Sequence, residues 1–182
     1  MCEGENSQTR VLTIGHSTRS IGEFVRILKR HGATCVVDVR SVPRSRHNPQ
    51  FNRETLPASL ASAGIAYTHL SGLGGLRRPR PDSINTGWRN ASFRGFADHM
   101  QTPEFEASLE SLLQLARKDR VTLMCTEAVP WRCHRSLIAD ALVARGISTE
   151  HIISETRREV HSLRAFAEVS GSRVTYPSGD ER

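Results

Sequence analysis

The sequence contains no apolar run near the roughly 18 residues that a membrane-spanning helix requires. No secretory signal precedes Val11, so we expect a cytoplasmic protein that has no contact with a membrane. Cysteine is scarce, and a chain of 182 residues can bury a core without disulfide bonds. We therefore expect free thiols, available for chemistry or for metals, at Cys2, Cys35, Cys125 and Cys133.

Several familiar signatures are also missing. The chain has no P-loop, no Gly-x-Gly-x-x-Gly motif, no paired Cys-x-x-Cys knuckles and no internal repeat. The glycine-rich stretch Gly72–Gly75 is predicted to be a turn and not a phosphate cradle, because no helix clearly follows it. The common nucleotide-binding loops and zinc-knuckle folds are therefore not indicated.

The net charge is +6, and many arginines fall in two presumed loops, residues 43–53 and 76–94. A basic surface of this kind favours an anionic partner, either nucleic acid or a phosphorylated small molecule. The alternative is a charge excess that only keeps the protein in solution.

Apolar segments typical of strands alternate with segments typical of helices. The predicted strands are residues 11–15, 35–39, 65–70, 121–125 and 147–153. Five helices are predicted. One begins at Ser20, in a capping box with Glu23, and one spans residues 54–62. A third carries Phe105, Leu109 and Leu112 on one stripe, a fourth begins at Arg132, and a fifth spans residues 162–169. This alternation predicts a three-layer α/β sandwich around a mostly parallel sheet of about five strands.

One domain accounts for the length of the chain. We expect it to span residues 11–169, between a disordered N-terminal tail, residues 1–10, and a C-terminal tail, residues 170–182. Parallel strands place their carboxyl ends at one edge of a sheet. Polar side chains that follow the predicted strands should therefore converge there, namely His16, Asp38, Arg40, His69, Cys125 and Glu127.

A set of short motifs resembles one known family. The motifs are Ile14-Gly15-His16-Ser17, Val37-Asp38-Val39-Arg40 with Pro43, Phe51-Asn52, Gly72–Gly75, Met124-Cys125-Thr126-Glu127 and Cys133-His134-Arg135. Together they resemble the bacterial and archaeal family called domain of unknown function 488, from about Leu12 to Ile153. The resemblance implies an α/β fold in which these residues form one site, and it supplies no established reaction.

Four residues are candidates for catalysis. Cys133, at a predicted helix N-terminus, is placed to be a thiolate nucleophile. Cys125 ends a strand and faces either the site or the core. Glu127 is a general acid or base, unless it pairs with Arg132 or Arg135. His134 moves a proton, unless it is a packed, hydrogen-bonded histidine.

A further set is predicted to bind substrate. Arg40, Arg44 and Arg135 would hold phosphate, with His16 and Asp38 across the site. Trp88 would stack on a base, unless it packs as a lid of the core. No metal site is assigned. Cys125, Cys133 and His134 are ligand types for a transition metal, but the neighbours Cys133 and His134 would rarely both reach one ion.

These residues predict a thiol-dependent enzyme of hydrolase or transferase type, acting on an anionic ligand, either a nucleotide or nucleic acid. Two alternatives stay open: a non-catalytic nucleic-acid-binding module, and a metal-binding protein with Cys and His ligands. The sequence indicates neither the reaction nor the oligomeric state.

Overall fold

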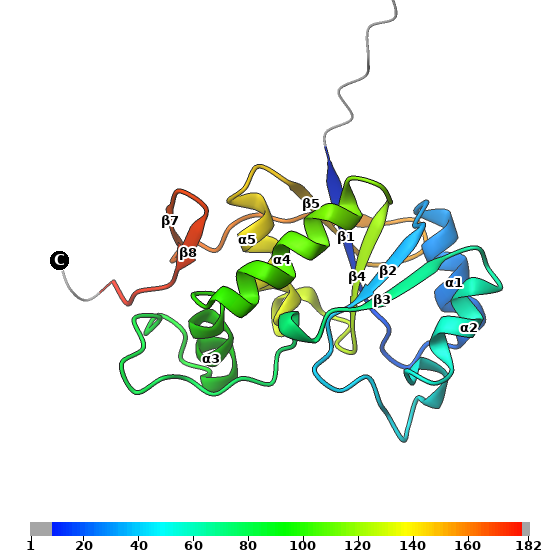
Figure 1. Ribbon diagram of the computed structural model, residues 1–182, viewed down its shortest axis with the longest axis horizontal. Coiled ribbons are helices and arrows are strands. Elements are labelled where there is room, and N and C mark those ends of the chain that lie inside the picture. Colours follow the sequence, from blue (N-terminus) through cyan, green and yellow to red (C-terminus); the bar gives the residue numbers. More distant parts are fainter. Residues whose placement is uncertain (1–8, 180–182) are drawn as a thin grey trace, which may run out of the picture.

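The computed structural model describes residues 9–179 and has a single mixed sheet at its centre (Figure 1). The strands are β1 (Arg10–Gly15), β2 (Cys35–Asp38), β3 (Ala66–His69), β4 (Val121–Cys125), β5 (Ser148–Ile152), β6 (Arg158–Val160), β7 (Glu168–Ser170) and β8 (Arg173–Thr175). The six-stranded sheet has the order β3-β2-β4-β1-β5-β6, and β7 and β8 form a separate hairpin. All neighbours are parallel except β6, which runs antiparallel to β5. The predicted α/β fold with a mostly parallel sheet is confirmed.

Helices cover both faces of this sheet. The α-helices are α1 (Ile21–Arg30), α2 (Leu56–Ala61), α3 (Ala91–His99), α4 (Pro103–Ala116) and α5 (Arg135–Val143). Short 3₁₀ turns occur at η1 (Pro49–Phe51), η2 (Ser71–Leu73) and η3 (Pro130–Arg132). Helices α1 and α2 lie on one side of the sheet, and α3, α4 and α5 lie on the other (Figure 1). None of these helices, within residues 9–179, is long and apolar enough to cross a membrane.

The two helical layers bury separate sets of side chains because residues alternate between the faces of a strand. Along β4, Leu123 and Cys125 belong to the core beneath α3, α4 and α5, whereas Met124 belongs to the core beneath α1 and α2. The register of the strands then fixes where they end. Gly15 lies opposite Cys125, and Asp38 lies opposite Met124. The polar residues that follow β1, β2 and β4 therefore meet at one edge.

Most local signals on the first half of the chain are confirmed. Ser20 is the N-cap of α1, and its hydroxyl accepts a hydrogen bond from the Glu23 backbone at 3.2 Å. Helix α2 is shorter than the predicted segment 54–62, and Pro57 occupies its first turn, where its missing N–H costs nothing. Helix α3 was not predicted. It begins after Asn90, whose side chain accepts hydrogen bonds from the backbone of Ser92 and Phe93.

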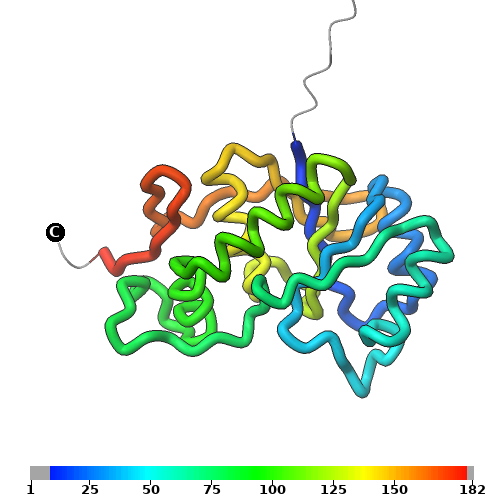
Figure 2. Tube along the Cα trace, viewed as in Figure 1, coloured from blue at the N-terminus to red at the C-terminus, as the bar shows by residue number. Residues whose placement is uncertain are grey.

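The C-terminal region differs from the prediction. The helix predicted over residues 162–169 is absent, and the chain there forms turns that lead into the β7–β8 hairpin. An aromatic side chain of this segment packs on the domain instead, where Phe166 lies edge-on against Trp88 at 5.0 Å between ring centroids. Tyr176, after the hairpin, is fully buried, and its carbonyl accepts a hydrogen bond from Gly87. The red C-terminal segment accordingly runs beside the green loop that precedes α3 (Figure 2). The hairpin lies across the predicted boundary between domain and C-terminal tail. The predicted N-terminal tail falls outside the described residues, except for Thr9 and Arg10.

Candidate functional site

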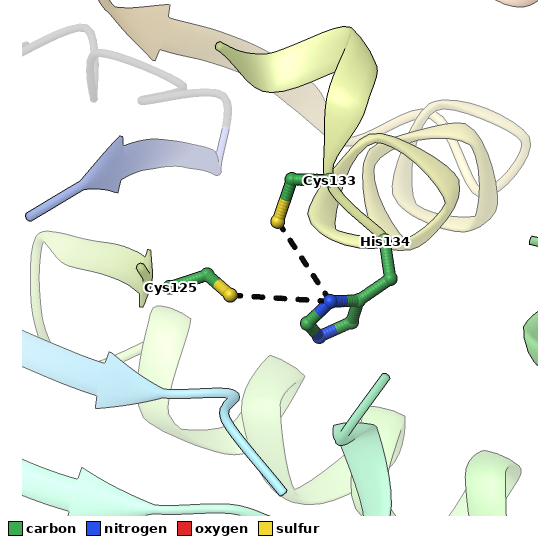
Figure 3. A group of neighbouring side chains, drawn as sticks. All are labelled: Cys125, Cys133 and His134. Carbon is green, nitrogen blue, oxygen red and sulfur yellow. Dashed lines mark hydrogen bonds between the residues drawn. The ribbon is translucent and has the colours of Figure 1, made fainter. Parts of the chain in front are cut away.

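Two cysteines and a histidine meet at the carboxyl edge of the sheet. The Nδ1 atom of His134 lies 3.7 Å from the Cys133 sulfur and 4.0 Å from the Cys125 sulfur (Figure 3). All three ligand atoms lie within 4.8 Å of one another. Cys125 comes from the end of β4, and the other two residues come from the link between η3 and α5. We call these three residues the Cys/His cluster.

Cys133 and His134, neighbours that were expected rarely to reach one ion together, both lie beside Cys125, and the local backbone explains why. Helix α5 begins at Arg135 and not at Arg132, because η3 intervenes. Cys133 has an extended backbone (φ −128°, ψ 142°), whereas His134, the N-cap, is already helical (φ −58°, ψ −19°). This change of conformation between two neighbours turns both side chains toward Cys125.

The ring of His134 is held in one orientation. Its Nε2 donates a hydrogen bond to the Val39 carbonyl at 2.9 Å, since a carbonyl oxygen only accepts. The ring also packs edge-on against Phe96 at 5.0 Å between centroids. On a third side it lies so close to Gly75 that a Cβ there would be 2.4 Å from Nδ1. With Nε2 protonated, Nδ1 faces the sulfurs either with a lone pair or, in the imidazolium, with a proton.

The surroundings give the two thiols different acidities. A hydrogen bond from the Cys125 thiol lowers the pKa of Cys133 well below the usual value, and His134 and the charge of Arg135 add to this against the effect of burial. Donating that hydrogen bond raises the pKa of Cys125, and its burial raises it further. The cluster therefore favours a thiolate at Cys133 beside a neutral thiol at Cys125. Cys125 belongs to the core and also lines the site.

Arg135 supplies a buried positive charge behind Cys133. Its side chain is fully buried and donates to the carbonyls of Glu127 and Ala128 and to the hydroxyl of Thr13. Within residues 9–179 it forms no ion pair with a carboxylate. Arg135, which was predicted to hold phosphate, therefore lies beneath the site and is not among the residues that line the cavity beside it.

A chain of hydrogen bonds extends from Arg135 into the protein. Thr13 bonds His151 Nδ1 at 2.6 Å, and His151 Nε2 bonds His161 Nδ1 at 2.9 Å. His161 Nε2 then bonds Asp140 Oδ1 at 2.7 Å. The other Asp140 oxygen accepts from the Tyr176 hydroxyl at 2.6 Å. An arginine only donates and a carboxylate only accepts, so a consistent assignment places the donors in one direction, from Arg135 to Asp140. We call this the Arg135–Tyr176 hydrogen-bond chain.

A second buried network holds the neighbouring strand end. Arg40 forms a two-pronged ion pair with Asp38, with distances of 2.9 and 2.6 Å, and its side chain is 5% exposed. It also donates to the Phe51 carbonyl and approaches His16 Nε2 at 3.3 Å. Burial lowers the pKa of His16 to about 4, so this ring is neutral at pH 7. The charge of Arg40 is already neutralised by Asp38. The backbone carbonyl of Arg40 is hydrogen-bonded to His69 Nε2 at 2.8 Å.

A cavity of about 420 Å³ opens beside the Cys/His cluster. Its lining comprises Arg40, Ser41, Val42, Gly75, Leu76, Asn90, Ser92, Phe93, Cys125, Thr126, Glu127, Arg132, Cys133 and His134. Within residues 9–179, Glu127 makes no ion pair with Arg132 or Arg135. Its carboxylate accepts a hydrogen bond from the Val129 backbone at 3.1 Å. Val42 and Leu76 are 62% and 79% exposed. The cavity thus has a polar, sulfur-lined floor and an apolar rim.

Of the predicted site residues, Cys125, Glu127, Cys133, His134 and Arg40 line this cavity. Asp38, His16 and Arg135 lie behind it, bonded to backbone or to other site residues. Arg44 is exposed and does not line it. Trp88 is 9% exposed and stacks beneath Phe93 at 4.8 Å, so the core position is the one observed.

Three contributors had no role assigned to them from the sequence, although Gly75 and Val39 lie in the motifs of the family resemblance. Gly75 admits the His134 ring, the Val39 carbonyl orients it, and Phe93 forms a wall of the cavity. The run of glycines was a usable signal for close packing, because a glycine permits an approach that any Cβ would block. A backbone carbonyl leaves no sequence signal at all.

The fold and the cavity define a class, an α/β protein with a Cys/His cluster at the carboxyl edge of a mostly parallel sheet. Residues 20–142 match the family described as "Domain of unknown function DUF488", and this covers more than half of the chain. The protein belongs to that family. Neither a curated protein nor a solved structure matches the chain.

Proposed function

We propose that the protein is a thiol-dependent enzyme whose nucleophile is the Cys133 thiolate and whose substrate is a small anion of nucleotide size. The observation that carries the proposal is the position of Cys133 in the cavity, between a thiol donor, an imidazole and a buried guanidinium. A thiolate is the reactive form of cysteine, and a neighbouring acid and positive charge are the usual means of favouring it.

The charges around the cavity support an anionic substrate. Two nine-residue helices, α3 and α5, begin at residues that line it, Asn90 and His134. Helix N-termini carry partial positive charge. Arg132 also lines the cavity and forms no ion pair within residues 9–179. Arg40, in contrast, is already paired with Asp38, so Arg132 is the guanidinium available to a ligand.

The roles of the other groups follow from their placement. The lone pair of Cys133 would form the bond to an electrophilic carbon or phosphorus atom of the substrate, and the leaving group would depart with its electron pair. His134, whose Nδ1 lies 3.7 Å from the Cys133 sulfur, and Glu127 both line this cavity, and either can supply or accept the proton. Val42, Leu76 and Phe93 would contact an apolar part of the substrate, such as a base.

Alkylation of each cysteine against pH tests the proposal, with labelled peptides read by mass spectrometry. We expect Cys133 to react with a midpoint well below the ordinary thiol value of about 8.5. Cys35 is the internal control, since burial raises its pKa to about 11. The ratio of the alkylation rate with anionic iodoacetate to that with neutral iodoacetamide should be higher at Cys133 than at a free peptide thiol, and Arg132→Gln should lower this ratio. A Cys133 that reacts as slowly as Cys35 at pH 7 would contradict the proposal.

A second candidate, binding of a transition metal, is favoured by the geometry of the Cys/His cluster. In a tetrahedral site with zinc–sulfur and zinc–nitrogen bonds of about 2.3 and 2.0 Å, nitrogen and sulfur lie about 3.5 Å apart. The observed separations are 3.7 and 4.0 Å. The cavity would provide the fourth position. Alkylation that becomes fast only after treatment with a chelator, together with zinc or iron in the purified protein, would favour this candidate over the free thiolate.

A further inference from the structure

Cys125 and Cys133 are close enough to react with each other. Their sulfurs flank the same His134 nitrogen and lie within 4.8 Å, whereas a disulfide bond is about 2.0 Å long. The link between them, residues 126–132, contains only the three-residue turn η3 and carries exposed side chains at Thr126, Ala128, Trp131 and Arg132. A modest rotation of the two side chains, accommodated by this surface link, would close the gap.

Access and isolation also set this pair apart from the third described cysteine. Both sulfurs belong to residues that line the cavity, so a reagent as small as a peroxide can reach them. Cys35 is 1% exposed and begins β2, opposite Val121, at the other edge of the sheet. Four strand positions separate Val121 from Cys125 along β4. Cys35 therefore cannot take part in the same exchange.

We propose that Cys125 and Cys133 are a redox-modification site, at which a peroxide converts the two thiols into a disulfide that a small thiol reduces again. Cys133 is the residue oxidised first, and Cys125 is the resolving cysteine. Both residues are buried at the cavity wall, and a nucleophilic thiol that a small oxidant reaches beside a second thiol is the arrangement that favours a reversible disulfide over irreversible oxidation.

The chemistry balances without any group beyond the peroxide. The Cys133 sulfur attacks one peroxide oxygen, a sulfur–oxygen bond forms, the oxygen–oxygen bond breaks, and the departing alkoxide or hydroxide takes up a proton. The Cys125 sulfur then attacks the resulting sulfenic acid. The sulfur–sulfur bond forms, the sulfur–oxygen bond breaks, and the hydroxyl leaves as water with the proton of the Cys125 thiol. Two thiols lose two electrons in total, and one peroxide is reduced to an alcohol, or water, plus water.

This modification would also silence the site. Once Cys133 is in a disulfide it is no longer a thiolate and cannot act as the nucleophile. The loss of activity rests on the proposed function, whereas formation of the disulfide rests only on the position of the two sulfurs.

The test is a hydrogen peroxide titration of the full chain after treatment with a chelator, with every cysteine peptide mapped by mass spectrometry. We expect a Cys125–Cys133 cross-linked peptide, two mass units lighter than the dithiol, that dithiothreitol reverses. In Cys125→Ser, Cys133 should instead be trapped by dimedone as a sulfenic acid and proceed to the irreversible sulfinic acid. Cys35→Ser, and a Cys2→Ser variant, should form the cross-link as the wild type does.

Two results would overturn the inference. One is oxidation of wild-type Cys133 to the sulfinic acid with no cross-link. The other is that wild type and Cys125→Ser give the same oxidation products. The alkylation profile of the untreated protein is read separately. A cross-link in a protein whose Cys133 alkylates slowly would leave the redox site standing and remove the proposed nucleophile.

Discussion

Replacing Tyr176 with phenylalanine removes one oxygen atom from the end of the Arg135–Tyr176 hydrogen-bond chain and leaves the packing of the ring. The hydroxyl donates to Asp140 at 2.6 Å, and both residues are fully buried. A hydrogen bond to a charged group contributes about 1.5–3 kcal/mol. We expect Tyr176→Phe to lower the free energy of unfolding by that amount, which for a chain of this size corresponds to a fall in Tm of about 3–12 °C.

Urea unfolding followed by circular dichroism gives the free energy of unfolding, and three comparisons make the result specific. Tyr176→Ala also opens a cavity and should cost about 3–5 kcal/mol for the lost ring. Deletion of residues 170–182, the predicted tail, removes buried Val174 in addition to Tyr176 and should lower the free energy of unfolding at least as much as Tyr176→Ala. Tyr67→Phe loses a similar bond to Asp38 at 2.8 Å, but in a half-buried setting, and should cost less. A Tyr176→Phe protein within about 0.5 kcal/mol of wild type would refute the reasoning.

Three further predictions concern the site. Gly75→Ala places a Cβ 2.4 Å from His134 Nδ1, so the ring must move and alkylation of Cys133 should slow, whereas Gly22→Ala, which meets no atom within 4 Å, should leave it unchanged. Asp38→Asn leaves Arg40 buried without its ion pair and should cost about 3–5 kcal/mol in urea unfolding; an unchanged midpoint would contradict this. The pKa of His16 is lowered to about 4, so between about pH 6.5 and pH 4 the unfolded chain binds a proton that the folded chain excludes. The stability that neutral His16 contributes is therefore fully present above pH 6.5 and is lost as the pH drops through that window. Tm measured against pH should consequently fall less steeply in His16→Gln.

The parts of the fold that were predictable are those that depend on continuous apolar runs. Residues 121–125 are buried throughout, and a short continuous apolar run of this kind is typical of a buried strand. Residues 158–160 carry only one apolar side chain, Val160, which is 74% exposed, so the antiparallel edge strand β6 gives no such signal. Helix α3 was hidden by Gly95 and by its position after a long polar loop. Gly95 is there because α3 packs on the backbone of Arg77, where a Cβ would lie 2.5 Å from the carbonyl.

The convergence of residues at the carboxyl edge was predictable from parallel topology alone, because strand ends meet whatever the strand order. Which side chains face the cavity was not. Arg40 and Arg135 read alike in sequence, yet one is neutralised by Asp38 and the other is held by carbonyls. Asp38 lies only 2 positions from Arg40, whereas the partners of Arg135, namely Ala128, Glu127 and Thr13, lie 7, 8 and 122 positions away.

The Arg135–Tyr176 hydrogen-bond chain also has an evolutionary consequence. Each member's proton is placed by its neighbour, so a single change, such as Thr13→Val, leaves both Arg135 Nε and His151 Nδ1 without a partner. We expect these six positions to be inherited together or replaced together among family members. Four of them, Thr13, His151, His161 and Tyr176, lie outside the matched range of residues 20–142. Covariation in this family should therefore be sought in sequences that include the first strand and the C-terminal hairpin.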